Sequence, residues 1–237
     1  MTLHSAAEDE NEYFYEWLKH SPGLREREDQ IVRADQDKDI ETVSAVLSLR
    51  KFYIQKYAHA IPTNTALTAI ADFAPIIEIG AGTGYWAFLL RRRGVDIICY
   101  DRNPPGSADG SNRFHEGATC WTDVSAGDDS AIDLHPSRAL LLCWPPPHDE
   151  MPLRALRRFR GQYFIYIGEL PTDVDGCLYV VGPNKPIRKG VTISHAFFEE
   201  LQQGWELQRC LELPHWEICW DNLYAFKRRA RLGHKES

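Results

Sequence analysis

The amino-acid sequence predicts an α/β protein in which a doubly wound, mostly parallel sheet follows a helical N-terminal arm. From Pro75 onward, short apolar segments alternate with amphipathic helical patterns. This alternation is typical of parallel strands that are covered by helices on both faces. A short connection joins the last two apolar segments, which favours an antiparallel hairpin at the edge of the sheet.

The expected elements follow from the period of the apolar residues. Strands are expected at 76–79, 95–100, 118–124, 139–144, 163–168, 205–213 and 220–228, with a short one at 178–181. Helices are expected at 84–93, 149–160 and 194–203. The Gly/Pro-rich segment 170–193 is too long for a plain connector, so it is either a lid or substrate loop or a surface insertion.

The N-terminal arm is expected to be helical because apolar residues recur there at helical spacing. One apolar stripe lies at 13–18 and another at 40–57, and Pro22-Gly23 separates them. Asn64 is a candidate cap for a short helix that ends before Pro75. These boundaries divide the chain into a helical arm or cap at 1–62, a ligand-binding domain at 63–230 and a basic tail at 231–237.

The net charge of the chain is concentrated in the arm. The 237 residues carry 34 acidic and 27 basic side chains, a net charge of −7. Residues 1–41 hold 12 acidic and 5 basic side chains, and the remaining residues hold 22 of each. Because the sheet domain is charge-balanced, the acidic composition argues only weakly against a nucleic-acid partner.

The composition predicts a globular cytoplasmic protein without a metal site. The longest uncharged apolar run, Ala139–Trp144, has six residues, far fewer than the roughly 20 that span a bilayer. The N-terminus is acidic and shows no apolar signal segment. The six cysteines form neither a CxxC pair nor a Cys/His cluster. Neither zinc nor disulfides are therefore expected, and a reducing compartment fits best.

The segment IIEIGAGTGYW, residues 76–86, carries the strongest functional signal. It combines an apolar strand, a glycine-rich turn and the start of a helix. Glycines at alternate positions allow a tight turn and let a ligand approach the backbone N–H groups at the helix N-terminus. In such sheets, ligands bind beyond the carboxyl ends of the strands. The alternative is a tight turn that binds no ligand.

The details of this turn favour a cationic ligand with a ribose over a nicotinamide dinucleotide. The dinucleotide fingerprint GxGxxG requires a third glycine where this chain has Tyr85. Glu78 lies two residues before the first glycine, where a carboxylate repels a pyrophosphate and attracts an amino group. Asp101 closes the next strand, where it can accept hydrogen bonds from both hydroxyls of a ribose.

At these residues the chain resembles the class I S-adenosylmethionine-dependent methyltransferases, over roughly residues 75–228. The resemblance implies a seven-stranded Rossmann-like sheet, with S-adenosylmethionine as the cofactor. It implies that the E-x-G-x-G-x-G motif holds the methionine and adenosine parts, and that Asp101 binds the ribose. The motif residues are Glu78, Gly80, Gly82 and Gly84.

The resemblance implies further cofactor contacts from three places in the chain. Residues just before the first strand often cover the cofactor, which makes Tyr53, Tyr57 and His59 candidates, although packing explains the tyrosines equally well. An acidic residue after the third strand often meets the adenine. Asp123 is the chosen candidate, with Asp128 and Asp129 as alternatives. Other residues expected near the cofactor are Tyr85, Trp86 and Cys143.

The fourth strand ends in Trp144-Pro145-Pro146-Pro147, which is similar to the N/D-P-P-aromatic motif of amino-group methyltransferases. Trp144 replaces the amide or acid that holds a target amine in those enzymes, so methylation of adenine or glutamine is not expected. Trp144 is either part of the active site or plain packing. Candidate catalytic groups besides Trp144 are Glu169, at the end of the fifth strand, and His148, with Asp149, His195 and His215 as further candidates.

The expected activity is methyl transfer from S-adenosylmethionine by in-line displacement, to a small-molecule acceptor and without a membrane partner. A protein or RNA acceptor, a catalytically inactive cofactor-binding or scaffold protein and a nicotinamide-dependent oxidoreductase are the alternatives. Basic clusters at 91–93 and 154–160 lie on expected helices and are assigned to solvated helix faces, and a third lies at 227–231. No RNA-binding module accompanies them.

Overall fold

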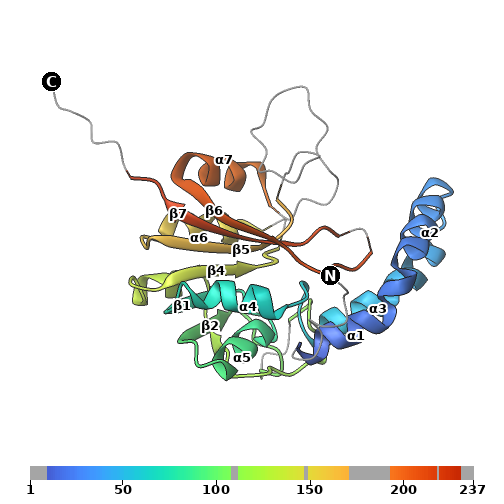
Figure 1. Ribbon diagram of the computed structural model, residues 1–237, viewed down its shortest axis with the longest axis horizontal. Helices are drawn as coiled ribbons and strands as arrows, with labels where there is room; N and C mark the ends of the chain where they lie inside the picture. The colour runs from blue at the N-terminus through green and yellow to red at the C-terminus, as the bar shows by residue number, and fades with distance from the viewer. Residues whose placement is uncertain (1–9, 108–111, 147–148, 171–192, 218, 231–237) are drawn as a thin grey trace.

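The computed structural model describes residues 10–107, 112–146, 149–170, 193–217 and 219–230. Seven strands of this part of the chain form one sheet in the order β3-β2-β1-β4-β5-β7-β6 (Figure 1). β7 is antiparallel to both neighbours and the other adjacent pairs are parallel, so the predicted doubly wound sheet with its antiparallel C-terminal hairpin is confirmed. The strands are β1 (Ile76–Ile79), β2 (Ile97–Asp101), β3 (Ser125–Ala126), β4 (Ala139–Cys143), β5 (Tyr163–Gly168), β6 (Trp205–Glu212) and β7 (Asn222–Arg228).

Helices cover both faces of the sheet, and successive residues of β1 face opposite layers, as strand geometry requires. Ile76 packs in the core cluster that contains residues of α4 and α5, whereas Ile77 and Ile79 pack in the cluster that contains residues of α6 and α7. Glu78 therefore shares the face of Ile76. The helices are α4 (Asn64–Ala71), α5 (Tyr85–Arg92), the 3₁₀ helix η2 (Asp129–Leu134), α6 (Met151–Arg158) and α7 (His195–Gly204).

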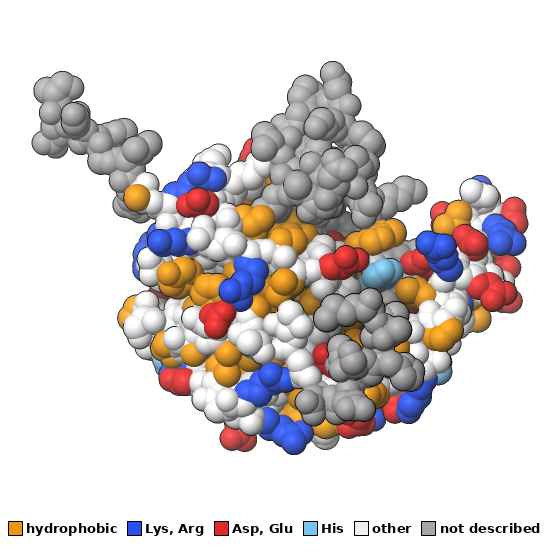
Figure 2. Space-filling view, in the orientation of Figure 1, with side chains coloured by type: hydrophobic (Ala, Val, Ile, Leu, Met, Phe, Trp, Pro, Cys, Tyr) orange, Lys and Arg blue, Asp and Glu red, His pale blue; other side chains and the backbone are white. Residues whose placement is uncertain are grey.

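The N-terminal arm consists of α1 (Glu12–His20), the 3₁₀ turn η1 (Ser21–Gly23), α2 (Leu24–Gln36) and α3 (Ile40–Lys56). The predicted helices of the arm are confirmed, and Pro22-Gly23 lies in the turn that separates α1 from α2. In Figure 1, α2 projects away from the sheet, and Figure 2 shows side chains of both charges at its surface.

α1 and the end of α3 belong to the core of the sheet domain. The side chain of Tyr13 is fully buried, and its hydroxyl oxygen accepts a hydrogen bond from Trp216 Nε1 over 2.9 Å. The indole of Trp17 donates to the backbone oxygen of His215 over 2.9 Å. The arm is thereby attached to the connection between β6 and β7.

Two local predictions are wrong. The third strand is Ser125–Ala126 rather than 118–124, because the backbone of the predicted segment bonds elsewhere: Trp121 N donates to Thr83 O, and Asp123 O accepts from Arg91. The short helix before β1 is capped by Thr63, whose hydroxyl accepts a hydrogen bond from Ala66 N, and not by Asn64. The remaining helix and strand boundaries agree with the predictions to within about two residues.

The expected strand at 178–181, most of the segment 170–193 and the basic tail 231–237 lie outside the described residues. Among the helices that the structure describes, none combines the length and apolar character needed to cross a membrane.

Candidate functional site

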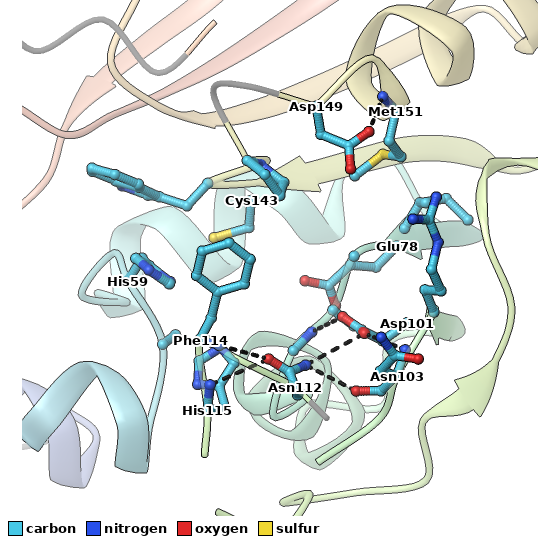
Figure 3. Close-up of a pocket in the computed structure, with 18 of the residues that line it drawn as sticks. His59, Glu78, Asp101, Asn103, Asn112, Phe114, His115, Cys143, Asp149 and Met151 are labelled. Carbon is cyan, nitrogen blue, oxygen red and sulfur yellow. Dashed lines mark hydrogen bonds between the residues drawn. The ribbon is translucent and has the colours of Figure 1, made fainter. Parts of the chain in front are cut away.

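A cavity of about 470 Å³ opens at the carboxyl ends of β1, β2 and β4 (Figure 3). The end of α3, the glycine turn and the connections after β2 and β4 contribute to its wall. The described residues whose side chains or backbone carry the argument below are Tyr57, His59, Glu78, Gly80, Gly82, Trp86, Asp101, Asn103, Asn112, Phe114, His115, Asp128, Cys143, Trp144, Pro146 and Asp149.

The glycine turn requires glycine for steric as well as conformational reasons. Gly80, Gly82 and Gly84 have φ angles of 74°, 54° and 70°, which L-residues rarely adopt. A Cβ atom on Gly82 would lie 2.5 Å from His115 Nε2, and one on Gly84 would lie 2.7 Å from Val124 Cγ2. The backbone of Gly80 and Gly82 lines the cavity, whereas Gly84 lies behind the wall.

Glu78 is a buried carboxyl group in the cavity wall, with 1% of its surface exposed. Its Oε2 atom has no hydrogen-bond partner among the described residues. Burial raises the pKa of Glu78 to about 8; the charge of Arg91 opposes this shift and that of Asp101 adds to it. The group is therefore mainly protonated at neutral pH, and a cation bound beside it would favour its ionised form.

Asp101, at the end of β2, is fixed by the backbone around it. Its Oδ2 accepts the N–H of Gly82 over 2.8 Å, and its Oδ1 accepts the N–H of Asn103 over 2.9 Å. Asn112 Nδ2 approaches the same Oδ1 at 3.4 Å. Figure 3 shows Glu78 and Asp101 facing the same cavity, so two carboxyl groups from adjacent strands converge there.

Trp144 lies at the opposite end of the cavity, in a left-handed backbone conformation with φ 47°. Its backbone N–H bonds to Ile167 O, and its indole Nε1 donates to Asp221 Oδ1 over 2.5 Å. The imidazole of His59 stacks on the indole, with ring centroids 5.3 Å apart and planes at 20°. The guanidinium carbon of Arg50 lies 5.8 Å from the indole centroid. The ring of Trp144 is therefore fixed from several sides.

Two carboxyl groups lie buried near Trp144 and outside the cavity wall. Glu169 Oε1 accepts the N–H of Trp220 over 2.7 Å. Burial raises the pKa of Glu169 to about 7, against the hydrogen bond from Trp220 and the charge of Arg50. Burial likewise raises the pKa of Asp221 to about 7, against the hydrogen bond from Trp144, and the nearby Glu169 adds to the shift.

The structure brings together most of the predicted cofactor residues. Glu78, Gly80, Gly82, Trp86, Asp101, Cys143 and Tyr57 all line the cavity, and so does Trp144, which was predicted as a catalytic candidate. Tyr85 does not: it is buried against the arm, where its hydroxyl contacts Asn11 and Tyr13 N. Asp128 lines the cavity, whereas Asp123 does not and Asp129 binds Arg154. His148 lies outside the described residues.

The other candidate bases differ in position. Asp149 lines the cavity, while Glu169, His195 and His215 do not. Three of the four arginines in the 154–160 cluster are paired with acids of neighbouring elements: Arg154 with Asp129, Arg157 with Glu200 and Arg158 with Asp133. No group of three or more His, Cys, Asp or Glu residues in the described part of the chain is arranged to hold a metal ion.

Several residues of the site have no distinctive sequence pattern. Asn112, Phe114 and His115 belong to the connection between β2 and β3, and Asp221 lies just before β7. The only sequence signal for the first three is that an unusually long connection follows the ribose-binding candidate Asp101. Asp221 is brought to Trp144 by the antiparallel return of β7, which no local motif encodes.

No protein-family model matches the chain, and no curated protein matches it. Solved structures with a similar arrangement include three methyltransferases. The 1,6-didemethyltoxoflavin-N1-methyltransferase of Burkholderia thailandensis, with bound 1,6-didemethyltoxoflavin and S-adenosylhomocysteine, is 16% identical, over 89% of this chain and 90% of its own, at a TM-score of 0.43. The magnesium protoporphyrin IX methyltransferase of Synechocystis, with bound S-adenosylhomocysteine, is 10% identical. The match covers 70% of this chain and 82% of that protein, at a TM-score of 0.42. The tRNA (uracil-54, C5)-methyltransferase of Pyrococcus abyssi is 10% identical. The match covers 73% of this chain and 40% of that protein, at a TM-score of 0.40. Similarity at this level does not assign a ligand or an acceptor to this chain.

Proposed function

We propose that this chain is an S-adenosylmethionine-dependent methyltransferase that binds its cofactor in the cavity beside the glycine turn. The observation that carries the proposal is Glu78, a buried carboxyl group in the cavity wall with one oxygen unpaired among the described residues. A buried polar atom without a partner costs free energy, and a ligand that supplies the partner recovers that cost. The ammonium group of a methionine moiety has the charge and the hydrogen-bond donors to do so.

Asp101 is suited to the ribose of the same cofactor. Its two backbone hydrogen bonds, from Gly82 and Asn103, hold the carboxylate at the cavity wall. The long contact from Asn112 is one that a ribose hydroxyl can replace, because hydroxyls donate shorter bonds to a carboxylate. Asp128, which also lines the cavity, is then the acid available to the adenine amino group.

The same geometry argues against a nicotinamide dinucleotide. In that class the pyrophosphate lies on the N-terminus of the helix after the glycine turn. Here Val124 and Thr122 approach Gly84, the residue that precedes α5, so closely that a Cβ there would lie 2.7 Å and 3.2 Å from their methyl groups. A pyrophosphate also lacks a cationic group, so it would not favour the ionised form of Glu78.

The cofactor, when bound, supplies a methyl group activated by its sulfonium sulfur. The residues of the chain contribute position and exclusion of water. The indole of Trp144, held by Asp221, and the imidazole of His59 form a fixed aromatic wall at one end of the cavity. Aromatic faces also stabilise a cationic group. Neither Glu169 nor Asp221 lines the cavity, so neither is assigned a direct role as a base.

The acceptor is proposed to be a small molecule. Rings of His59, Phe114 and Trp144 gather at one end of the cavity, which suits a ligand of limited size. The arginines of α6, which form one of the three basic clusters, already bind Asp129, Asp133 and Glu200, which leaves less positive charge there for phosphates.

A labelling experiment tests this function. The protein is incubated with methyl-tritiated S-adenosylmethionine and a cell extract that has been separated into metabolite, protein and RNA fractions. Label in the metabolite fraction is expected, with at least a tenfold loss for Glu78→Gln and none for Glu206→Gln, an exposed acid on β6. Label in protein or RNA would overturn the small-molecule acceptor. An absence of label in every fraction would instead favour an inactive cofactor-binding protein.

A further inference from the structure

The end of the cavity near Trp144 is built from aromatic rings of three separate segments. His59 follows α3, Phe114 belongs to the connection between β2 and β3, and Trp144 follows β4. The His59 ring lies 6.1 Å from that of Phe114 at 73°, and 5.3 Å from that of Trp144 at 20°. Figure 3 shows His59 and Phe114 on the same side as Cys143, away from Asp101 and Asn103. The ribose-binding and aromatic ends of the cavity are therefore distinct.

Within the part of the chain that the structure describes, ring contacts hold His59 in place. Besides Phe114 and Trp144, its ring meets that of His115 with centroids 5.7 Å apart. Its nitrogens form no hydrogen bond with the described residues, although the residue lines the cavity. A fixed imidazole whose nitrogens have no partner among the described residues is positioned to hydrogen-bond to a ligand.

The groups around His59 determine its protonation state and therefore which hydrogen bonds it can form with a ligand. Burial lowers the pKa of His59 to about 3, and the charges of His115 and Arg50 act in the same direction. The imidazole is therefore neutral near pH 7, with one N–H donor and one nitrogen acceptor. So weak a base removes protons poorly, which excludes His59 as the general base. A nucleophile beside His59 therefore gains no proton acceptor from this imidazole.

We propose that the end of the cavity formed by His59, Phe114 and Trp144 binds a planar nitrogen heterocycle, which packs against these rings and hydrogen-bonds to His59 through its polar edge. The inference rests on the proposed function, since it names the class of methyl acceptor. In the transfer, a ring-nitrogen lone pair forms the new N–C bond as the C–S bond of the donor breaks. Sulfur keeps the electron pair of that bond, and any proton on the methylated nitrogen leaves to water.

Two pairs of neutral lactams test this inference on protein saturated with S-adenosylhomocysteine. In each pair the planar and saturated members share the amide edge: 2-pyridone with piperidin-2-one, and isoquinolin-1-one with its octahydro analogue. Dissociation constants are measured by saturation-transfer NMR. At least one planar lactam is expected to bind fivefold or more tightly than its saturated partner, because only the planar ring can stack.

Variants separate ring packing from hydrogen bonding. His59→Phe keeps an aromatic ring and removes both nitrogens, so binding of the preferred planar lactam should weaken by about 3- to 10-fold while S-adenosylhomocysteine binds as before. His195→Phe, at an exposed position on α7, should change neither. If S-adenosylhomocysteine binds but no planar lactam is preferred, or if His59→Phe has no effect, the inference is wrong. A failure of S-adenosylhomocysteine itself to bind would contradict the proposed function, and the inference would fall with it.

Discussion

The indole Nε1 of Trp144 donates a hydrogen bond to Asp221 Oδ1 over 2.5 Å and thereby joins the end of β4 to the start of β7. The bond fixes the ring that closes the aromatic end of the cavity. The side chain that accepts the bond is shielded from water, since only 3% of the surface of Asp221 is exposed. The position of the Trp144 ring at the cavity therefore depends on the buried carboxyl group of Asp221. Burial of this group should make the stability of the protein depend on pH.

The free energy of unfolding should fall as the pH rises from 5 to 8, in part because of Asp221. Burial raises its pKa from 3.8 to about 7, so the folded state holds a proton that the unfolded chain has already lost. The stabilising contribution is complete below about pH 4 and is lost as the pH rises through 7. Urea unfolding of Asp221→Asn should show a pH dependence smaller by about 1–3 kcal/mol between pH 5 and 8.

The control for this prediction is Glu206→Gln, which removes an exposed acid from β6 and should leave the slope unchanged. The amide oxygen that Asp221→Asn introduces can still accept the indole N–H, so the substitution tests the charge rather than the hydrogen bond. Identical pH slopes in the wild type and Asp221→Asn would show that Asp221 is ionised in the folded protein at pH 5.

Gly82 should tolerate alanine less well than Gly94 does. Both have positive φ angles, of 54° and 77°, and so share a backbone strain of about 1–2 kcal/mol. At Gly82 the new Cβ also meets the His115 ring at 2.5 Å, whereas nothing lies within 4 Å at Gly94. Urea denaturation should show a larger loss for Gly82→Ala, and His115→Ala should remove the excess in a double-mutant cycle. Equal losses at the two glycines would mean that His115 moves aside without cost.

The acids near the cavity should contribute unequally to binding of S-adenosylhomocysteine. Asp101→Ala should weaken it by about 1–3 kcal/mol, because charge-assisted hydrogen bonds are lost. Asp128→Asn should weaken binding a few-fold, because the new side chain can still accept the hydrogen bond from Ser130 N that caps the helix η2. Asp123→Asn should have no effect, since Asp123 does not line the cavity. Calorimetric titration ranks the three variants, and a larger effect at Asp123 than at Asp128 would reverse the assignment of the adenine end.

Much of the fold is predictable because local patterns and tertiary structure agree. β1 and β5 are short, predominantly apolar runs that become buried on both faces, and their boundaries are predicted without error. β3 fails because it has only two residues, too few for a period to show. The apolar residues of 118–124 misled the prediction, since Trp121 packs on Tyr57 and Tyr85 rather than within the sheet.

The cofactor end of the site is predictable from sequence and the aromatic end is not. Glu78 lies on β1, the glycines follow in the next turn, and Asp101 ends the adjacent β2, so their positions in the sequence indicate their proximity. The contacts of His59 with Trp144 and of Trp144 with Asp221 join residues 85 and 77 positions apart. Such contacts depend on how the arm and β7 pack, which residue spacing does not reveal.

The stability of the protein should depend on the ion pair between Arg27, in the arm, and Glu217. The Glu217 side chain is fully buried, whereas that of Arg27 is 21% exposed, so Arg27→Ala leaves a buried carboxylate without its cation. The free energy of unfolding should fall by about 2–4 kcal/mol, and adding Glu217→Gln should restore most of it. Arg33→Ala is the matched control, since its partner Asp29 lies 4.0 Å away with both side chains exposed, and it should be neutral. A loss that persists in the double variant would assign the effect to packing of the Arg27 side chain.

Glu78 is proposed to receive the ammonium group of the cofactor. The most direct test is a calorimetric titration with S-adenosylhomocysteine at pH 7, carried out in two buffers that differ in ionisation enthalpy. Because burial raises the pKa of Glu78 to about 8, binding should release about one proton as the carboxyl group ionises. Glu78→Gln should bind at least tenfold more weakly and release none, and NAD should not bind. Tight binding of NAD without S-adenosylhomocysteine, or equal binding of S-adenosylhomocysteine by the wild type and Glu78→Gln, would contradict the claim.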